Sequence, residues 1–306
     1  MSCDEIVERF LSWQAGLGSD KPFFAYLHFL EPHATYSPRE PFRDVFRPEK
    51  GRALPEGHTM GYPEWAVQRD EINAGMRSVS RTDLQDMIDL YDGEIAWADS
   101  AVGRLKSALI ERGLYSGALV IVTADHGENF IEHGVIEHPV NALYEPQIRI
   151  PLVVKFPVAW GVGPAKLSGP VETLDIPYTV AAAAGAGAFG RGENLLSFAA
   201  AGRCRRRTVI TEGVSGFAVF TGAIKACFKE ADSGVNMFRV YSMKSDAGET
   251  RDLLAMKPSY AARTTACVRR WREFTASRAD DASAPLDAVP RDPERMRRLR
   301  ALGYLQ

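Results

Sequence analysis

A long amphipathic segment between two apolar runs constrains the fold of this chain most strongly. In residues 82–112, apolar side chains recur at alternating steps of three and four, which gives one continuous stripe along a helix. Almost unbroken apolar runs of strand length precede and follow this segment, at 22–30 and 118–124. A strand, a helix and a strand in this order predict a right-handed crossover between parallel strands, with 22–30 covered by helices on both faces.

Further segments continue the alternation of helix and strand. The spacing of apolar residues predicts helices over 3–16 and 171–186, and an apolar run predicts a strand at 151–156. Thr82 and Gln85 fit a capping box at the start of the long helix, and Gly113 fits its C-terminal stop. The sequence therefore predicts an α/β core over residues 1–187, with a mainly parallel sheet flanked by helices.

The pattern changes after residue 187. Short β-like segments occur at 208–213, 216–222 and 237–243 without long helices between them, which predicts a small antiparallel sheet. Apolar residues at helical spacing over 260–274 predict a closing helix, so residues 188–275 are expected to form a C-terminal subdomain. Residues 276–306 are expected to be a polar tail that ends in a short helix.

Charge and composition exclude several classes of function. The 306 residues carry a net charge of −2, so no general basic field attracts nucleic acid or an anionic membrane. No apolar stretch approaches the length that spans a bilayer, and the N-terminal MSCDEIVERF lacks the positive charge and apolar core of a signal peptide. A soluble protein is expected, but its compartment stays open. The four cysteines form no CxxC pair, which disfavours a zinc site or a disulfide framework.

An acid and an imidazole lie where a predicted strand ends. Asp125 and His126 follow strand 118–124, and ligands of open α/β sheets bind beyond the carboxyl ends of strands. A carboxylate beside an imidazole suits Ca²⁺, Mg²⁺, Mn²⁺ or Zn²⁺, depending on the remaining ligands. The alternative is that Asp125 caps a helix and His126 is incidental.

Histidines gather in the same two regions of the sequence. His28 and His33 lie in and after the first predicted strand, and His133 and His138 follow His126. This clustering favours a site that polarises an anion or moves protons. His28 lies inside its strand and is expected to be buried and hydrogen-bonded. The proline-rich segment from residue 31 to about 74 is long for a connection, so part of a binding cleft is expected there.

Several of these segments together resemble the sulfatase branch of the alkaline phosphatase superfamily. The resemblance rests on FFAYLHFLEPHATYSP, on YDGEIAWADSAVGRLKSALIERGLYSGALVIVTADHGENFIEHG, on PQIRIPLVVKFP and on DAGETRDLL, which occur in the family's order. It covers roughly residues 20–275 and the last dozen. The resemblance implies an alkaline-phosphatase-like fold and hydrolysis of sulfate esters. Many members of the family are periplasmic or secreted.

The resemblance also implies roles for individual residues. Asp125 and His126 would ligate a divalent cation, usually calcium or magnesium in such enzymes, and His33 would contact the sulfate or phosphate group. His138 would neutralise the anion or assist the leaving group, and His133 would support that set. Cations and proton donors around the ester oxygens are what an in-line displacement on a dianionic ester requires.

One part of the family pattern is missing from this chain. No cysteine is followed by the C-x-P/A-x-R signature that gives such enzymes a formylglycine nucleophile, and relatives carry that signature and two further acidic ligands in an N-terminal segment. The chain alone is therefore expected to be incomplete, and to hydrolyse esters weakly or not at all. Alternatives are a phosphoester or phosphonate hydrolase, a phosphoethanolamine transferase, or a non-catalytic anion-binding subunit that pairs with a separate N-terminal chain.

Overall fold

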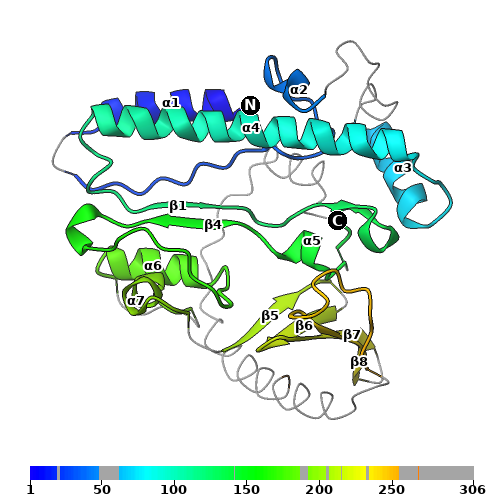
Figure 1. Cartoon of the computed structure of the whole chain (residues 1–306). Coiled ribbons are helices and arrows are strands. Elements are labelled where there is room, and N and C mark those ends of the chain that lie inside the picture. Colours follow the sequence, from blue (N-terminus) through cyan, green and yellow to red (C-terminus); the bar gives the residue numbers. More distant parts are fainter. Residues whose placement is uncertain are drawn as a thin grey trace, which may run out of the picture.

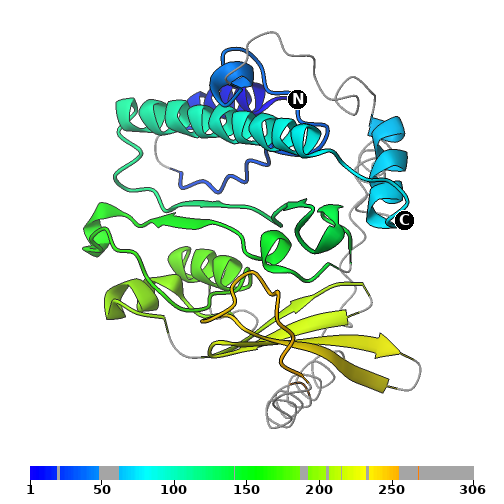
Figure 2. The same cartoon turned by 45° about the vertical axis from the view of Figure 1, so that its right-hand side comes forward.

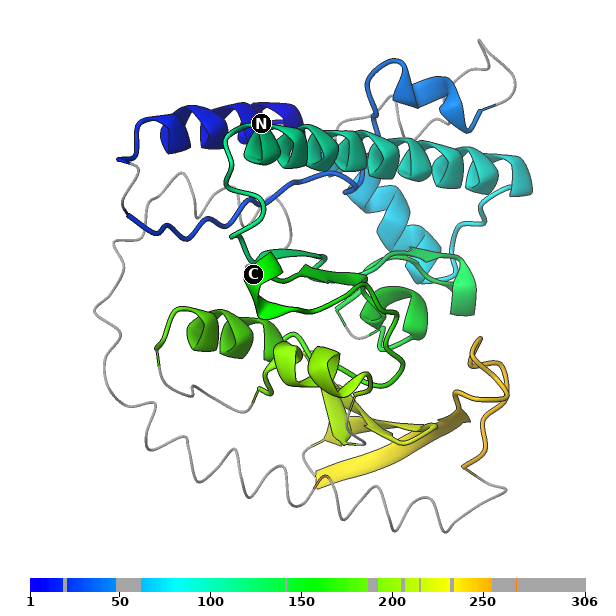
Figure 3. The same cartoon turned by 60° about the vertical axis from the view of Figure 1, so that its left-hand side comes forward.

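The computed structural model describes residues 1–18, 21–47, 62–140, 142–186, 192–204, 207–214, 216–231, 234–254 and 268. Its elements stack in layers (Figure 1). Helices α1 (Cys3–Ala15) and α4 (Arg81–Glu111) form the outer layer, strands β1 (Val120–Thr123) and β4 (Leu152–Lys155) lie inside, and helices α6 (Asp175–Ala183) and α7 (Leu195–Ala201) cover the far side. Two rotated views show the same order of layers (Figures 2 and 3). None of the described helices combines the length and apolarity needed to cross a membrane.

The two helices of the outer layer confirm the predictions from apolar spacing. Helix α1 begins after Ser2, which forms a capping box with Glu5. Helix α4 begins after Ser80, whose hydroxyl accepts a hydrogen bond from the Asp83 amide at 3.0 Å. The predicted capping box at Thr82 and Gln85 is therefore wrong, because Thr82 already lies inside the helix. The chain leaves α4 at Gly113, whose φ of +70° most side chains avoid, so the predicted stop is confirmed.

A buried acid ties the outer layer together. Cys3 and Val7 of α1 pack against Ala101 of α4 in a small apolar core. Beside this core, Asp4 accepts a hydrogen bond from the Trp97 indole at 2.9 Å, and its carboxylate lies 2.6 Å from the Arg39 guanidinium. Asp4 therefore joins α1, α4 and the loop that follows residue 30.

The predicted parallel sheet is not found in the part of the chain that the structure describes. Strands β1 and β4 pair antiparallel, with Val120 opposite Lys155 and Thr123 opposite Leu152. The connection between them contains the two-stranded β2 (Asn129–Phe130) and β3 (Ile136–Glu137), the 3-10 turn at Glu132–Gly134 and the single turn α5 (Glu145–Ile148). Parallel neighbours are usually joined by a crossover helix, whereas the connection over 124–151 contains only two-residue strands and single helical turns.

Segment 22–30 also departs from its prediction. It runs extended between α4 and β1 in all three views, but none of its residues is part of a strand (Figures 1, 2 and 3). Its side chains alternate: Phe29 packs on the α1 and α4 core, whereas Phe24 and Tyr26 are 71% and 78% exposed. The segment is thus covered on one face only, and not on both faces as the apolar run suggested.

The long segment after residue 31 contains helices as well as loop. Helix α2 (Phe42–Val45) packs against α4, where Gly93 allows the contact, because a Cβ there would lie 2.8 Å from the Phe42 carbonyl oxygen. Helix α3 (Tyr62–Asn73) places Trp65 and Ile72 against Ile136 of β3 in the largest buried cluster of this half. Residues 48–61, which include His58, lie outside the described residues.

The C-terminal sheet confirms the predicted antiparallel arrangement. Its strands follow one another as neighbours: β5 (Thr208–Glu212), β6 (Gly216–Thr221), β7 (Ile224–Ala231) and β8 (Gly234–Ser242). One face buries Phe217, Val219 and Phe228, and the other packs Cys227 against Leu143 of the α/β part. The predicted helix 260–274, apart from residue 268, and the tail 276–306 lie outside the described residues, so the proposed domain boundaries stay predictions.

Candidate active site

The loop that leaves β1 carries Asp125 and His126. The Asp125 side chain is 55% exposed and accepts a hydrogen bond from the His126 amide at 3.0 Å. Because the chain then enters β2, Asp125 caps no helix and that alternative is wrong. Nδ1 of His126 lies 2.9 Å from the Gly127 carbonyl oxygen, so Nδ1 donates to that oxygen and Nε2 is the ring nitrogen left for another partner. Nε2 is buried and has no hydrogen-bond partner among the described residues.

Three imidazoles from separate segments meet beside this loop. The rings of His126 and His138 lie 4.0 Å apart between centroids, and the rings of His33 and His138 lie 5.2 Å apart. His33 comes from the loop after segment 22–30, and its Nδ1 lies 2.7 Å from the Ala34 carbonyl oxygen. The structure therefore brings together three of the histidines that the sequence singled out.

A buried carboxylate lies behind His138. Glu128 Oε1 is 3.1 Å from Nδ1 of His138, and the Glu128 side chain is almost completely buried. Burial acts to lower the pKa of His138, but the hydrogen bond and charge of Glu128 outweigh it and raise that pKa above the ordinary histidine value. A raised pKa widens the pH range over which the ring is protonated, and in that form Nε2 is a second donor. Sequence reasoning missed Glu128, although it belongs to the DHGEN cluster.

A second buried carboxylate holds the loop that bears His33. Glu94 of α4 accepts hydrogen bonds from the backbone amides of Ser37, at 2.7 Å, and of His33. Burial raises the pKa of Glu94 to about 8, and the nearby Glu31 carboxylate adds to the shift. The available signal was an acid that follows Leu90 by one helical turn on the side of α4 that faces the protein.

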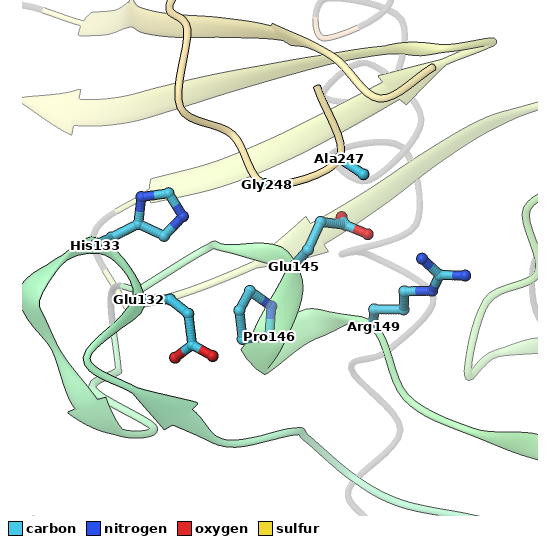
Figure 4. A pocket seen from close by; sticks show the side chains of 7 residues that line it. All are labelled: Glu132, His133, Glu145, Pro146, Arg149, Ala247 and Gly248. Atoms are coloured by element: carbon cyan, nitrogen blue, oxygen red, sulfur yellow. The ribbon is translucent and has the colours of Figure 1, made fainter. Parts of the chain in front are cut away.

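His133 faces a different set of residues. Its ring stacks on Tyr144 with centroids 3.7 Å apart, and its Nε2 lies 4.0 Å from the Glu249 carboxylate. It lines a cavity of 280 Å³ together with Glu132, Glu145, Pro146, Arg149, Ala247 and Gly248. Figure 4 shows His133 and Arg149 on opposite sides of α5, beneath the loop that carries Ala247 and Gly248. His133 therefore lies at the junction with the C-terminal sheet.

The backbone around His133 is strained. Ile131, His133 and Glu137 have φ values of 70°, 60° and 60°, and Glu249 across the cavity has a φ of 55°. Side chains disfavour this left-handed region, most of all a β-branched one such as that of isoleucine. Such strain persists only where the surroundings impose it, and it concentrates at functional sites.

His28 corrects a prediction. The sequence placed it in a strand covered on both faces, yet its side chain is exposed, with its ring 6.0 Å from that of Tyr26. The reason is the open face of segment 22–30, on which Tyr26 and His28 both lie. His28 takes no part in the imidazole cluster formed by His33, His126 and His138.

The residues present fit a divalent cation only in part. The buried Nε2 of His126 lies 3.9 Å from an Asp125 oxygen and lacks a hydrogen-bond partner in the described part of the chain, as a ligand atom would before a metal binds. However, no group of three or more His, Cys, Asp or Glu side chains within the described ranges is arranged to hold a metal ion. Asp125 and His126 would thus supply two ligands of a larger set.

Comparisons with known proteins found relatives in sequence and in structure. An arylsulfatase from Clostridium perfringens is 29% identical over 143 residues, which are 45% of this chain and 28% of that relative. The yidJ protein from Bacteroides fragilis superposes with a TM-score of 0.71 at 15% identity, over 90% of this chain and 59% of that chain. A phosphonate monoester hydrolase of Agrobacterium radiobacter superposes with a TM-score of 0.68 at 20% identity, over 90% and 62%.

The two superpositions show a shared fold, and the chain spans less than two thirds of the length of each of these three proteins. The sequence profile of the sulfatase family matches residues 1–186, which hold every histidine of the imidazole cluster together with Asp125. This chain therefore belongs to the sulfatase family.

Proposed function

We propose that this chain carries the ester-binding half of a sulfate ester hydrolase. The observation that supports the proposal best is the convergence of His33, His126 and His138. The ring centroid of His138 lies 5.2 Å from that of His33 and 4.0 Å from that of His126. The imidazoles of His33 and His138 can offer N–H donors to the oxygens of a sulfate group, and His126 lies beside them as the ligand proposed for a cation.

His138 is assigned to the leaving group. Glu128 contacts its Nδ1 and raises the pKa of the ring, which favours the form in which Nε2 also carries a proton. When the bond between sulfur and the ester oxygen breaks, the departing oxygen takes the electron pair and needs that proton. His33 is assigned to the sulfate oxygens, and Glu94 positions its loop.

A divalent cation, Ca²⁺ or Mg²⁺ with Mn²⁺ or Zn²⁺ as alternatives, is assigned to Asp125 and His126. When bound, it would supply positive charge to the sulfate oxygens. Mn²⁺ gives a direct test, because its electron paramagnetic resonance signal falls on binding to protein. Asp125→Asn should weaken Mn²⁺ binding by tenfold or more, on the order of one ligand's contribution, whereas Asp99→Asn on the exposed side of α4 should leave it unchanged. Equal binding in the two variants would remove Asp125 from the proposed site.

The nucleophile is not assigned to a residue of this chain, since none of its cysteines begins a C-x-P/A-x-R pattern. We propose that the chain alone binds sulfate esters and turns them over slowly or not at all. The assay uses 4-nitrophenyl sulfate with the purified chain and measures binding by calorimetry and turnover by nitrophenolate release. His138→Ala and His33→Ala should each weaken binding by about tenfold, the loss of one charge-assisted hydrogen bond.

His28→Ala is the matched control, because His28 is exposed and outside the imidazole cluster. Ester binding that survives both His138→Ala and His33→Ala would contradict the assignment of the site. Rapid, metal-dependent turnover that Asp125→Ala abolishes would instead contradict the proposal that the chain alone is inactive.

A separate chain that supplies the N-terminal half is a further proposed partner, and exposed apolar side chains favour it. Phe24, Tyr26 and Val153 are 71%, 78% and 62% exposed, on segment 22–30 and β4. Exposed apolar side chains at this density are typical of a surface that another polypeptide covers.

Phosphonate monoesters remain the alternative substrate, because an imidazole cluster does not by itself distinguish sulfur from phosphorus. The same calorimetry with a phosphonate monoester compares the two classes.

A further inference from the structure

A lysine of the C-terminal sheet is completely buried where the sheet meets the α/β part. Lys225 belongs to β7, on the face that also carries Cys227 and that packs against Leu143. Its side chain has no exposed surface, and its Nζ lies 2.5 Å from Glu249 Oε1 and 3.6 Å from Glu145 Oε1. A buried ammonium group of this kind is retained only when carboxylates compensate its charge.

Glu249 also contacts two segments of the α/β part. Its side chain is also completely buried, and its Oε2 accepts a hydrogen bond from the Glu145 amide at 2.7 Å, at the start of α5. The same oxygen lies 4.0 Å from Nε2 of His133. Glu249 and His133 both adopt left-handed backbone conformations, so this contact joins two strained positions.

The other side of α5 supports the loop of Asp125 and His126. The Gly127 amide donates a hydrogen bond to the Gln147 carbonyl oxygen at 2.6 Å. The Gln147 side chain accepts from Asn129 Nδ2 and donates to the Pro139 carbonyl oxygen, each at 3.2 Å. Gly127 lies so close to α5 that a Cβ on it would be 2.1 Å from the Pro146 carbonyl oxygen. Movement of α5 would therefore displace the residue next to His126.

We propose that Lys225 is a positioning residue for the candidate active site, and this inference rests on the proposed function. Through Glu249 and Glu145, its charge fixes α5 and His133 against the C-terminal sheet, and α5 in turn fixes the loop that starts at Asp125. A buried ion pair contributes little to stability compared with apolar residues of the same size. The best-supported use of such a pair is to select one arrangement of the elements that it joins.

Hydrogen exchange measured by mass spectrometry on the whole chain tests this role without any need for activity. In Lys225→Met, the amides of residues 127–148 should exchange on the order of tenfold faster, because α5 loses its anchor. The amides of α1 should keep their wild-type rates. Lys229→Met is the matched control, since Lys229 lies on the same strand with its side chain exposed. The control should leave exchange unchanged throughout.

A double variant separates positioning from simple stability. Lys225→Met leaves Glu249 buried without its cation, so it should also lower the urea midpoint of unfolding. Lys225→Met combined with Glu249→Gln removes both charges and should recover most of that midpoint, while exchange over 127–148 stays fast. If exchange over 127–148 returns to the wild-type rate together with the midpoint, Lys225 serves stability alone and the inference is wrong. If Lys225→Met does not fold, the double variant is compared directly with wild type.

Binding of 4-nitrophenyl sulfate to the same variants connects the result to the site. The double variant should bind the ester about tenfold more weakly than wild type and Lys229→Met. Wild-type binding in the double variant, despite fast exchange over 127–148, would overturn the inference. No binding by wild type itself would overturn the proposed function, while the exchange data would still decide whether Lys225 positions α5.

Discussion

Individual residues of the imidazole cluster were predictable from where predicted strands end. His33, Asp125 and His126 follow apolar runs, and positions beyond strand ends converge in an α/β fold. Glu128 and Glu94 were not predicted as functional, because a carboxylate becomes the partner of a ring or a loop only through three-dimensional contacts. Glu94 lies on the buried side of α4, whereas the apolar Ile95 next to it is 42% exposed.

The dyad of Glu128 and His138 gives a prediction about protonation. Glu128→Gln removes the charge that raises the pKa of His138, so burial, which lowers that pKa, should then dominate. The pKa of the His138 ring, followed by NMR, should fall in this variant. In wild type the raised pKa stabilises the fold at pH values below the ordinary histidine pKa, and this contribution disappears as the pH rises through the folded-state value. An unchanged His138 pKa in the variant would show that Glu128 is not its partner.

Glu94 predicts a dependence of stability on pH. Its pKa is about 8 in the folded protein and ordinarily 4.5, so the folded state binds a proton between these values that the unfolded state has lost. The free energy of unfolding should therefore fall as the pH rises from 5 to 8, by on the order of a few kcal/mol at about 1.4 kcal/mol per pKa unit. Glu94→Gln should flatten this dependence in urea unfolding, and Asp99→Asn should not. Equal slopes in wild type and Glu94→Gln would contradict this.

At the scale of elements, periodicity predicted which segments form helices and strands but did not predict how the strands pair. Helices α1 and α6 and strands β1 and β4 lie within their predicted ranges, and α4 begins one residue before its predicted range. The pairing of β1 with β4 depends on the connection through β2, β3 and α5, whose two-residue strands and single turn are too short to produce a periodic signal.

The contact between Gly127 and α5 gives a prediction at this scale. Gly127→Ala places a Cβ 2.1 Å from a backbone oxygen of Pro146, so the loop or α5 must move. The free energy of unfolding in urea should fall by about 2–4 kcal/mol, as for overpacking against backbone. Gly103→Ala in α4 meets no atom within 4 Å and should raise it by about 0.5–1 kcal/mol, because alanine favours the helix. A stable Gly127→Ala protein would contradict the close contact.

For the whole molecule, the C-terminal sheet is more than the appended unit that the change in sequence pattern suggested. Its antiparallel strands were predictable from short β-like segments, whereas the buried contact of Lys225 with Glu249 and Glu145 was not. Three charged residues far apart in the sequence carry no common pattern, and only the packing of the sheet on α5 brings them together. Through these contacts the sheet is linked to the α/β part, which holds the histidines.

The account depends on one claim, that His33, His126 and His138 belong to a single site, in which His33 and His138 bind the anion and His126 lies beside it as a ligand of the cation. Titration of the purified chain with sodium sulfate, followed through the ring nitrogen shifts of its histidines, tests this claim most directly. The ring shifts of His33, His126 and His138 should follow one dissociation constant. Sodium chloride at equal ionic strength should not reproduce these shifts, and the exposed His28 should not respond to sulfate. Three unrelated responses, or shifts no larger than that of His28, would contradict the claim.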